Sequence, residues 1–180
     1  MINNLINQTN NSIVEKYCHG DNDANCAIYG GLYQWDELMN YSTSSNANPS
    51  GRQGICPTGW HVPSDAEFCQ METFLDATVN CANTGWIGTD VGGKLKETGT
   101  SHWTSPNIGA TNVSGFTALP GGLSYFGGGF ISLSTYATFW SAAESSSSAA
   151  WFRYLYYTVT QVNRDYNDKP YGFSGRCVRD

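Results

Sequence analysis

The chain has 180 residues, a length that fits one domain with a sizeable core plus a short appendage. Only 13% of the residues are charged, the net charge is −6, and the nine Lys and Arg residues are scattered, which argues against nucleic acid or an anionic membrane as a partner. No apolar run approaches the length of a membrane-spanning helix, and the abundance of Gly, Ser, Thr, Asn and Tyr is typical of an extracellular, loop-rich fold.

The N-terminal segment has the composition of a linker. Its sequence, MINNLINQTNNSIVEK, is rich in Asn and lacks the basic start and apolar stretch of a signal peptide. We therefore expect residues 1–16 to be a linker or N-terminal extension and residues 17–180 to be the domain. Such a chain is either excised from a longer protein or leaves its cell by another route, as a virion part would.

Two helices are predicted in the first half of the chain. Four apolar residues at helical spacing predict the first, over Leu32–Tyr41. Those residues are Leu32, Trp35, Leu38 and Met39. The second helix begins after Ser64, where Glu67 completes a capping box. Its expected buried stripe is Phe68, Met71, Phe74 and Leu75.

The chain after Asp76 is expected to be mostly turns and short strands. Gly115–Phe130 predicts strand, turn, strand, and its glycines precede no helix, so they are not a phosphate loop. The stretch FWSAAESSSSAAWFRYLYY predicts two strands joined by a solvated Ser/Ala turn. Further strand patterns cover Trp151–Gln161 and Gly172–Val178. The sequence thus predicts an α+β fold with two early helices and a β-rich second half.

Six cysteines and no C-x-x-C motif make zinc and thioredoxin-type chemistry poor explanations. Short loops favour the pairs Cys18–Cys26 and Cys69–Cys81, and Cys56–Cys177 would then tie the middle of the chain to its end. The alternative is six reduced, buried thiols. We expect at least two disulfides, which indicates an oxidising compartment and an extracellular, cell-surface or virion location.

Five ordered blocks carry a family resemblance over residues 17–180. They read CAIYGGLYQWDELMNY, GICPTGWHVPSDAEF, GGKLKETGTSHWTSPNIGATNVSGFTALPGG, FWSAAES and YGFSGRCVRD. Together they resemble the Fibrobacter succinogenes major paralogous domain. The resemblance implies a C-type-lectin-like fold, in which two helices pack on small, twisted antiparallel sheets and the terminal segments lie together. A Cys56–Cys177 bridge fits that topology.

The last thirty residues also resemble the variable segment of proteins encoded by diversity-generating retroelements, which use the same fold. Those systems rewrite adenines, chiefly in Asn codons, to vary a ligand-binding surface on a fixed scaffold. The positions that an altered Asn codon can encode here are Phe152, Tyr154, Tyr156, Thr158, Thr160, Asp165, Tyr166, Asp168 and Tyr171. The interspersed scaffold positions are Trp151, Arg153, Leu155, Arg164, Lys169, Gly172 and Phe173. If this segment is a binding face, we expect its ligand to be a protein or a surface glycan.

Composition supports a binding face independently of the resemblance. Five of the eleven tyrosines lie between Tyr154 and Tyr171 with Asn, Asp and Thr among them, which is typical of antibody-like binding surfaces. The alternative for each single tyrosine is an ordinary strand residue, because Tyr has a high β-propensity. Most of the six tryptophans are expected in the core, and Trp86 is the best exposed candidate.

No metal, cofactor or catalytic group is expected. The E-P-N, Q-P-D and W-N-D triplets of calcium-dependent lectins are absent, and an EF-hand loop from Asp21 would place Cys26 and Leu32 where Gly and an acid are required. Asp21–Asn25 is therefore expected to be a solvated acidic loop. Asp165–Asp168 contains oxygen atoms that could bind a cation, but a solvated acidic loop is expected there as well.

The histidines and glutamates also have ordinary explanations. His61 and His102 are expected to pack or to form hydrogen bonds, and Glu67 and Glu144 are explained by the capping box and a turn. The stretch WHVPSDAEF also resembles the formylglycine-generating enzyme, which would require a free thiol at Cys177.

Three hypotheses follow. The first is a non-enzymatic ligand-binding domain whose segment 152–171 is a diversified binding face. The second is an undiversified structural or adhesive module of a bacterial surface. The third is a catalytic relative of the formylglycine enzyme.

Overall fold

The structure is a computed structural model that describes residues 8–180, so the first part of the expected linker lies outside the described residues. The helices are α1 (Asp23–Tyr29), α2 (Trp35–Leu38), α3 (Asp65–Leu75) and α4 (Val91–Leu95), with a 3-10 turn at His19–Asp21. The strands are β1 (Leu32–Tyr33), β2 (Trp60–His61), β3 (Gly85–Ile87), β4 (Leu123–Ser124), β5 (Phe130–Ile131), β6 (Tyr136–Glu144), β7 (Ala149–Tyr156), β8 (Val162–Asp168), β9 (Phe173–Ser174) and β10 (Val178–Arg179). The predicted α+β class is confirmed.

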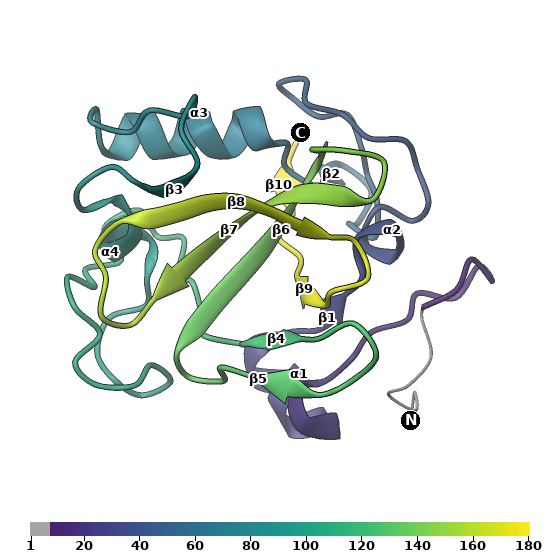
Figure 1. Ribbon diagram of the computed structural model, residues 1–180, viewed down its shortest axis with the longest axis horizontal. Helices are drawn as coiled ribbons and strands as arrows, with labels where there is room; N and C mark the ends of the chain where they lie inside the picture. The colour runs from purple at the N-terminus through teal and green to yellow at the C-terminus, as the bar shows by residue number, and fades with distance from the viewer. Residues whose placement is uncertain (1–7) are drawn as a thin grey trace.

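A twisted sheet organises the described residues, with strand order β1-β9-β6-β7-β8-β3. Neighbours are antiparallel except β6 and β9, which run parallel. Figure 1 shows α3 along the top of this sheet and α1, β4 and β5 at the bottom. The predicted hairpin is confirmed as β6 and β7, joined by the exposed serines 145–148. The strand-turn-strand expected in Gly115–Phe130 is confirmed only at its end, where β4 pairs with β5.

Alternate residues of β7 point to opposite faces of the sheet. Arg153 and Leu155 point to the face that α3 covers, which we call the back face. Phe152, Tyr154 and Tyr156 point to the other, front face. Near Phe152 the front face is covered by α2 and β9, whose Trp35, Leu38 and Phe173 belong to the same buried cluster as Trp140. At the other end of the front face, Tyr154 and Tyr156 are partly exposed.

The three predicted disulfides are confirmed. Cys18–Cys26 and Cys69–Cys81 close short loops, and Cys56–Cys177 joins residues 121 positions apart. In residues 8–180 every cysteine is paired, so Cys177 is not the free thiol that the catalytic hypothesis requires.

The helix predicted over Leu32–Tyr41 is wrong at both ends. Leu32 and Tyr33 form β1, because Leu32 exchanges two backbone hydrogen bonds with Tyr17 at 2.9 Å and pairs with Ser174 of β9. Only Trp35–Leu38 is helical. The helix cannot continue through Tyr41, since the φ angles at Asn40 and Tyr41 are positive.

The second predicted helix is confirmed as α3, with the Ser64–Glu67 capping box. Its buried stripe differs from the prediction, because Phe74 is 89% exposed. Glu72 occupies a fully buried position of the helix instead. An ion pair with Arg153 explains how a carboxylate replaces an apolar residue there.

Two helices were not predicted. Asp21–Asn25, expected to be a solvated loop, is largely exposed but contains the start of α1, which Asn22 caps. The α4 sequence, VGGKL, is a poor helix former, yet a side chain at Gly92 would lie 2.1 Å from the Gln161 carbonyl oxygen. Tight contact with the chain after β7 therefore explains Gly92, and the Gly109 carbonyl oxygen, 2.2 Å from where a side chain at Gly93 would begin, explains Gly93.

The C-terminal strands are shorter than predicted. The strand expected over Trp151–Gln161 ends at Tyr156, and the chain then turns over α4, where Gly93 donates a backbone hydrogen bond to the Thr160 carbonyl at 2.8 Å. The strand expected over Gly172–Val178 is two separate pieces, β9 and β10, which pair with β1 and β2. Strand β8 lies in a stretch for which no strand was predicted.

Candidate recognition face

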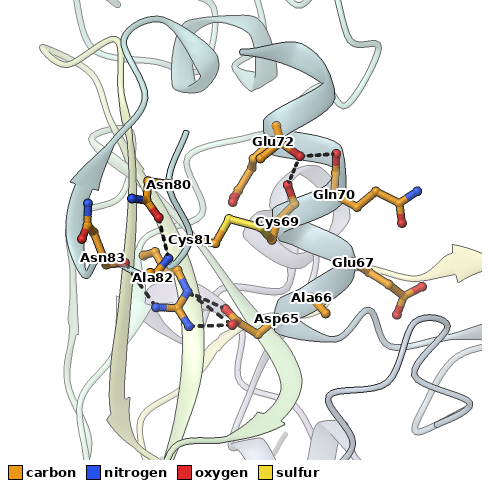
Figure 2. The surroundings of a disulfide bond; sticks show 12 residues. Asp65, Ala66, Glu67, Cys69, Gln70, Glu72, Asn80, Cys81, Ala82 and Asn83 are labelled. Carbon is orange, nitrogen blue, oxygen red and sulfur yellow. Dashed lines mark hydrogen bonds and ion pairs between the residues drawn. A yellow bond between two sulfur atoms is a disulfide. The ribbon is translucent and has the colours of Figure 1, made fainter. Parts of the chain in front are cut away.

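The back face holds β7 and β8 to α3 through a buried charge cluster. Arg153 donates from Nε to Glu72 Oε1 and from Nη1 to Asp65 Oδ1, both at 2.7 Å. Arg164 of β8 donates from Nη2 to Asp65 Oδ2 at 2.6 Å. Figure 2 shows Asp65 on α3 and the Cys69–Cys81 bridge, which attaches this helix to the segment before β3. One helix thus fixes two adjacent strands.

The electrostatics of this cluster follow from its burial. Burial raises the pKa of Glu72, and the nearby Arg153 only partly offsets that effect. For Asp65 burial acts in the same direction, but hydrogen bonds and charges from Arg164 and Arg153 outweigh it and lower the pKa. The surroundings of Asp65 therefore favour its ionised form, whereas the ionised form of Glu72 depends on the charge of Arg153.

The front face carries a group of aromatic rings. The rings of Tyr136 and Tyr156 stack with centroids 4.7 Å apart. Tyr154 meets Tyr136 edge-on at 5.5 Å and Trp86 at 4.9 Å. Burial, with Tyr136 and Asp165 nearby, raises the pKa of Tyr154, so its hydroxyl stays protonated at neutral pH. These partly exposed rings offer both apolar area and hydrogen-bonding hydroxyls.

Asn163 lies beneath two of these rings. Trp86 on β3 and Tyr154 on β7 both pair in register with Asn163 on the intervening strand, so their contact closes over it. Asn163 is 4% exposed, and its Oδ1 has no hydrogen-bond partner in residues 8–180. The face therefore contains a buried acceptor under an aromatic lid.

A small cavity of about 130 Å³ opens in the front face. Its lining residues are Leu123, Tyr136, Thr138, Phe152, Tyr154, Asn167 and Phe173. The lining is mainly apolar, with Thr138 and Asn167 as polar exceptions. We call the surface formed by Trp86, Tyr136, Tyr154, Tyr156 and Asp165, together with this cavity, the aromatic face.

A buried lysine holds the loop beside the aromatic face. Lys96 Nζ donates to the carbonyl oxygens of Ile108, Tyr156 and Val159 at 2.8, 3.1 and 3.0 Å. Burial lowers the pKa of Lys96 to about 8. All three ammonium protons have acceptors, so Lys96 links α4 to the end of β7 without a carboxylate.

A family model described as the Fibrobacter succinogenes major domain matches residues 2–179. The chain belongs to this family. The match agrees with the resemblance seen in the sequence blocks and also takes in residues ahead of Tyr17. No curated protein and no solved structure matches the chain.

In this family member, the residues predicted to bind ligand do not share one face. Tyr154, Tyr156 and Asp165 lie on the front face, as does Phe152, which is only 7% exposed and packs against Trp140. The remaining residues are distributed as follows: Tyr166 and Asp168 on the back-facing side of β8, Thr158 and Thr160 in the β7–β8 turn, and Tyr171 beside Tyr125 and Phe173.

The predicted scaffold positions are buried or are held by contacts with other side chains. Arg153, Leu155 and Phe173 are buried, and Arg164 lies over the Trp151 ring at 3.8 Å. Lys169 contacts the Trp35 ring and an oxygen of Glu144. With the exception of the buried Phe152, the interspersed pattern in the sequence thus separates fixed residues from more accessible ones, although it does not separate the two faces.

Sequence reasoning missed Tyr136, Asn163 and Asn167 as parts of this surface. Pairing explains each one: Tyr136 lies opposite Tyr156, Asn163 opposite Tyr154 and Asn167 opposite Ala150. The alternation Asn163, Asp165, Asn167 was the available signal, since it places three short polar groups on one face of a strand. Trp86, the expected exposed tryptophan, is 37% exposed, although Trp60 is 40% exposed.

The other polar candidates have structural partners. His61 Nε2 lies 2.7 Å from Glu67 Oε1 and Nδ1 lies 2.6 Å from Asp180 Oδ1. His102 contacts Glu97, and Glu144 pairs with Lys169. Residues 8–180 contain no group of three His, Cys, Asp or Glu side chains placed to hold a metal ion.

Two observations bear on location. The three disulfides indicate an oxidising, extracytoplasmic environment. Within residues 8–180, no helix has both the length and the apolar character needed to cross a membrane.

Proposed function

We propose that this chain is a non-enzymatic recognition domain and that the aromatic face binds its ligand, a protein or a surface glycan. The observation that carries the proposal is the contrast between the partly exposed Tyr rings at a cavity, one of them in contact with Trp86, and the buried charge cluster behind them. Aromatic anchors around a small pocket are typical of binding surfaces, and rigid support lowers the ordering cost of binding.

The finer assignment is a C-type-lectin-like fold. Support comes from the meeting of the terminal segments: β1 pairs with β9, β2 pairs with β10, and Cys56 is bonded to Cys177. The chain's family membership agrees with the sequence blocks that carry the resemblance, and both favour this fold. The disulfides favour display outside the cytoplasm, on a cell surface or a virion.

Diversification of segment 152–171 is the more specific form of the proposal. It is supported by Tyr154, Tyr156 and Asp165, which are accessible side chains between fixed strand positions. The second candidate, an undiversified surface module, is favoured by Phe152, since a core position tolerates variation poorly. The placement of Tyr166 away from the aromatic face favours it as well.

DNA sequence downstream of the Asp180 codon distinguishes these two forms. Diversification predicts a near-copy of the 3′ end beside a reverse-transcriptase gene, with differences at adenines in the codons of Tyr154, Tyr156 and Asp165. A locus with neither element would leave the undiversified module.

A binding experiment tests the recognition face itself. Fluorescent protein would be applied to a panel of bacterial cells and a glycan array, with Tyr156→Ala as the test variant. Tyr166→Ala is the matched control, because Tyr166 is 55% exposed and lies on the opposite side of the sheet. We expect Tyr156→Ala to abolish whatever binding the parent shows and Tyr166→Ala to retain it; equal effects, or no binding by the parent, would contradict the proposal.

A further inference from the structure

A second cavity, of about 510 Å³, lies on the other side of the molecule from the aromatic face. One wall is α3, with Phe68, Met71 and Phe74, and the other is formed by Phe116, Arg176 and Val178. Its volume falls in the range of about 300–1,000 Å³ that is usual for small-molecule pockets. We call this cavity the α3 groove.

Arg176 is a cation without an anion in this groove. Its guanidinium carbon lies 4.2 Å from the Phe116 ring, and Nη2 donates to the Phe116 carbonyl oxygen. No ion pair of Arg176 is found within residues 8–180, whereas the buried Arg153 and Arg164 both contact carboxylates. Burial lowers the pKa of Arg176, as expected where no anion offsets the loss of water.

Glu67, the carboxylate that lines the groove among the described residues, is already engaged. Glu67 Oε1 contacts His61, and Oε2 accepts hydrogen bonds from the backbone N–H groups of Ser50 and Ser64 at 2.9 Å. Since one N–H of Arg176 is used by the Phe116 carbonyl, the others remain for a planar acceptor. Guanidinium groups bind carboxylates through two parallel hydrogen bonds.

The apolar part of the groove is open to solvent in the part of the chain that the structure describes. Phe74 is 89% exposed and Val178 39% exposed, while Met71 is only partly buried. Met71, Phe74 and Val178 line the same groove, and contiguous apolar surface beside polar residues is typical of a ligand-binding groove.

We infer that the α3 groove binds an amphiphilic carboxylate. Its carboxylate group pairs with Arg176, and its hydrocarbon part lies along Met71, Phe74 and Phe116. The inference is independent of the aromatic face, because none of these residues belongs to that surface.

Decanoate is the probe, followed by NMR of protein labelled at the methionine methyl groups. Met71 lines the groove and reports binding, whereas Met39 is fully buried in a different cluster and serves as the internal control. Below the concentration at which decanoate self-associates, we expect saturable shifts at Met71 and none at Met39. Decanol, with the same chain and no charge, should bind at least about tenfold more weakly, as should decanoate to Arg176→Gln.

Two further variants keep the test decisive. Arg179→Gln removes a neighbouring, exposed charge that does not line the groove, and should change decanoate affinity by less than about twofold. If Arg176→Gln does not fold, Phe74→Ser replaces it, because an exposed side chain contributes little to folding. Equal affinity for decanol and decanoate, parallel shifts of Met39 and Met71, or unchanged affinity in Arg176→Gln would each overturn the inference.

Discussion

The two faces of the sheet are formed by the same strands, but the residues on them differ in burial. On β7, Arg153 and Leu155 are 2% and 1% exposed and contact α3 or its hydrophobic cluster, while Tyr154 and Tyr156 between and after them are partly exposed. A two-residue period therefore places a fixed residue beside an accessible one along a single strand. At this end of β7, stability should depend on the residues of the back face, and ligand contact on those of the front face.

The largest expected effect comes from breaking the back-face charge cluster. Arg153→Met leaves Glu72 without its ion pair and Asp65 with Arg164 alone. Loss of one partner from a buried ion pair costs about 3–5 kcal/mol, so we expect a fall of that size in the free energy of unfolding, measured by urea denaturation with the disulfides intact.

A second substitution identifies the cause. Because burial already favours the protonated form of Glu72, Glu72→Gln in the Arg153→Met background should recover part of the lost stability. Arg179→Met, at an exposed position of β10, is the control and should have little effect. A loss below about 1 kcal/mol for Arg153→Met would mean that the cluster does not anchor the strands.

Lys96→Met should have the next largest effect. The substitution removes three hydrogen bonds and leaves the carbonyl groups of Ile108, Tyr156 and Val159 without that donor. Buried groups left unsatisfied cost about 1–3 kcal/mol, part of which is offset because the charged ammonium group is no longer buried. Amide hydrogen exchange should accelerate in residues 157–161.

The exposed Lys16 supplies the comparison for this experiment. Lys16→Met should leave both stability and exchange unchanged. Unaltered exchange in residues 157–161 of Lys96→Met would show that α4, rather than the lysine, fixes the loop beside the aromatic face.

Local sequence signals predicted what local interactions determine. The Ser64–Glu67 capping box located the start of α3, and the Ser-rich run located the β6–β7 turn. Short spacing indicated two of the disulfides, which left Cys56–Cys177. Each of these features depends on residues a few positions apart, or on elimination among six cysteines.

Features set by distant contacts were not predicted. Leu32 matches a helical pattern but forms a strand with Tyr17 and β9, and Glu72 is buried only because Arg153 reaches it from β7. The aromatic face has the same origin: Trp86 and Tyr154 are 68 positions apart in sequence numbering and meet because β3 and β7 both pair with β8. Composition predicted a binding surface, and strand order decides which tyrosines form the aromatic face.

The pH dependence of stability should report on His61, with a smaller effect. Burial disfavours the charged imidazole, but hydrogen bonds to Glu67 and Asp180 outweigh burial and raise the pKa of His61 above its ordinary value. The group therefore contributes stability that is fully present below the unfolded-state pKa of about 6.5 and is lost as pH rises through the higher folded-state pKa. Exposure of Asp180 limits the size of this contribution.

Urea denaturation at a series of pH values from 5 to about 9 measures this contribution. In His61→Gln the loss of stability with rising pH through this window should be smaller than in the parent. Identical pH profiles for the two proteins would show that the two carboxylates do not act on the charged form of His61.

The smallest effect on stability is expected from Tyr156→Ser. Compared with a substitution at the adjacent Leu155, it tests most directly whether the two faces of β7 differ. Leu155→Ala leaves a cavity at a buried position and should lower the free energy of unfolding by about 2–5 kcal/mol. Tyr156→Ser removes a ring that stacks on Tyr136 at the open end of the sheet, so the melting temperature should fall by no more than about 2 °C. Differential scanning calorimetry compares both variants with the parent. If Tyr156→Ser were as damaging as Leu155→Ala, the tyrosines of the front face would be part of the core, and the proposal that they are available to a ligand would lose its physical basis.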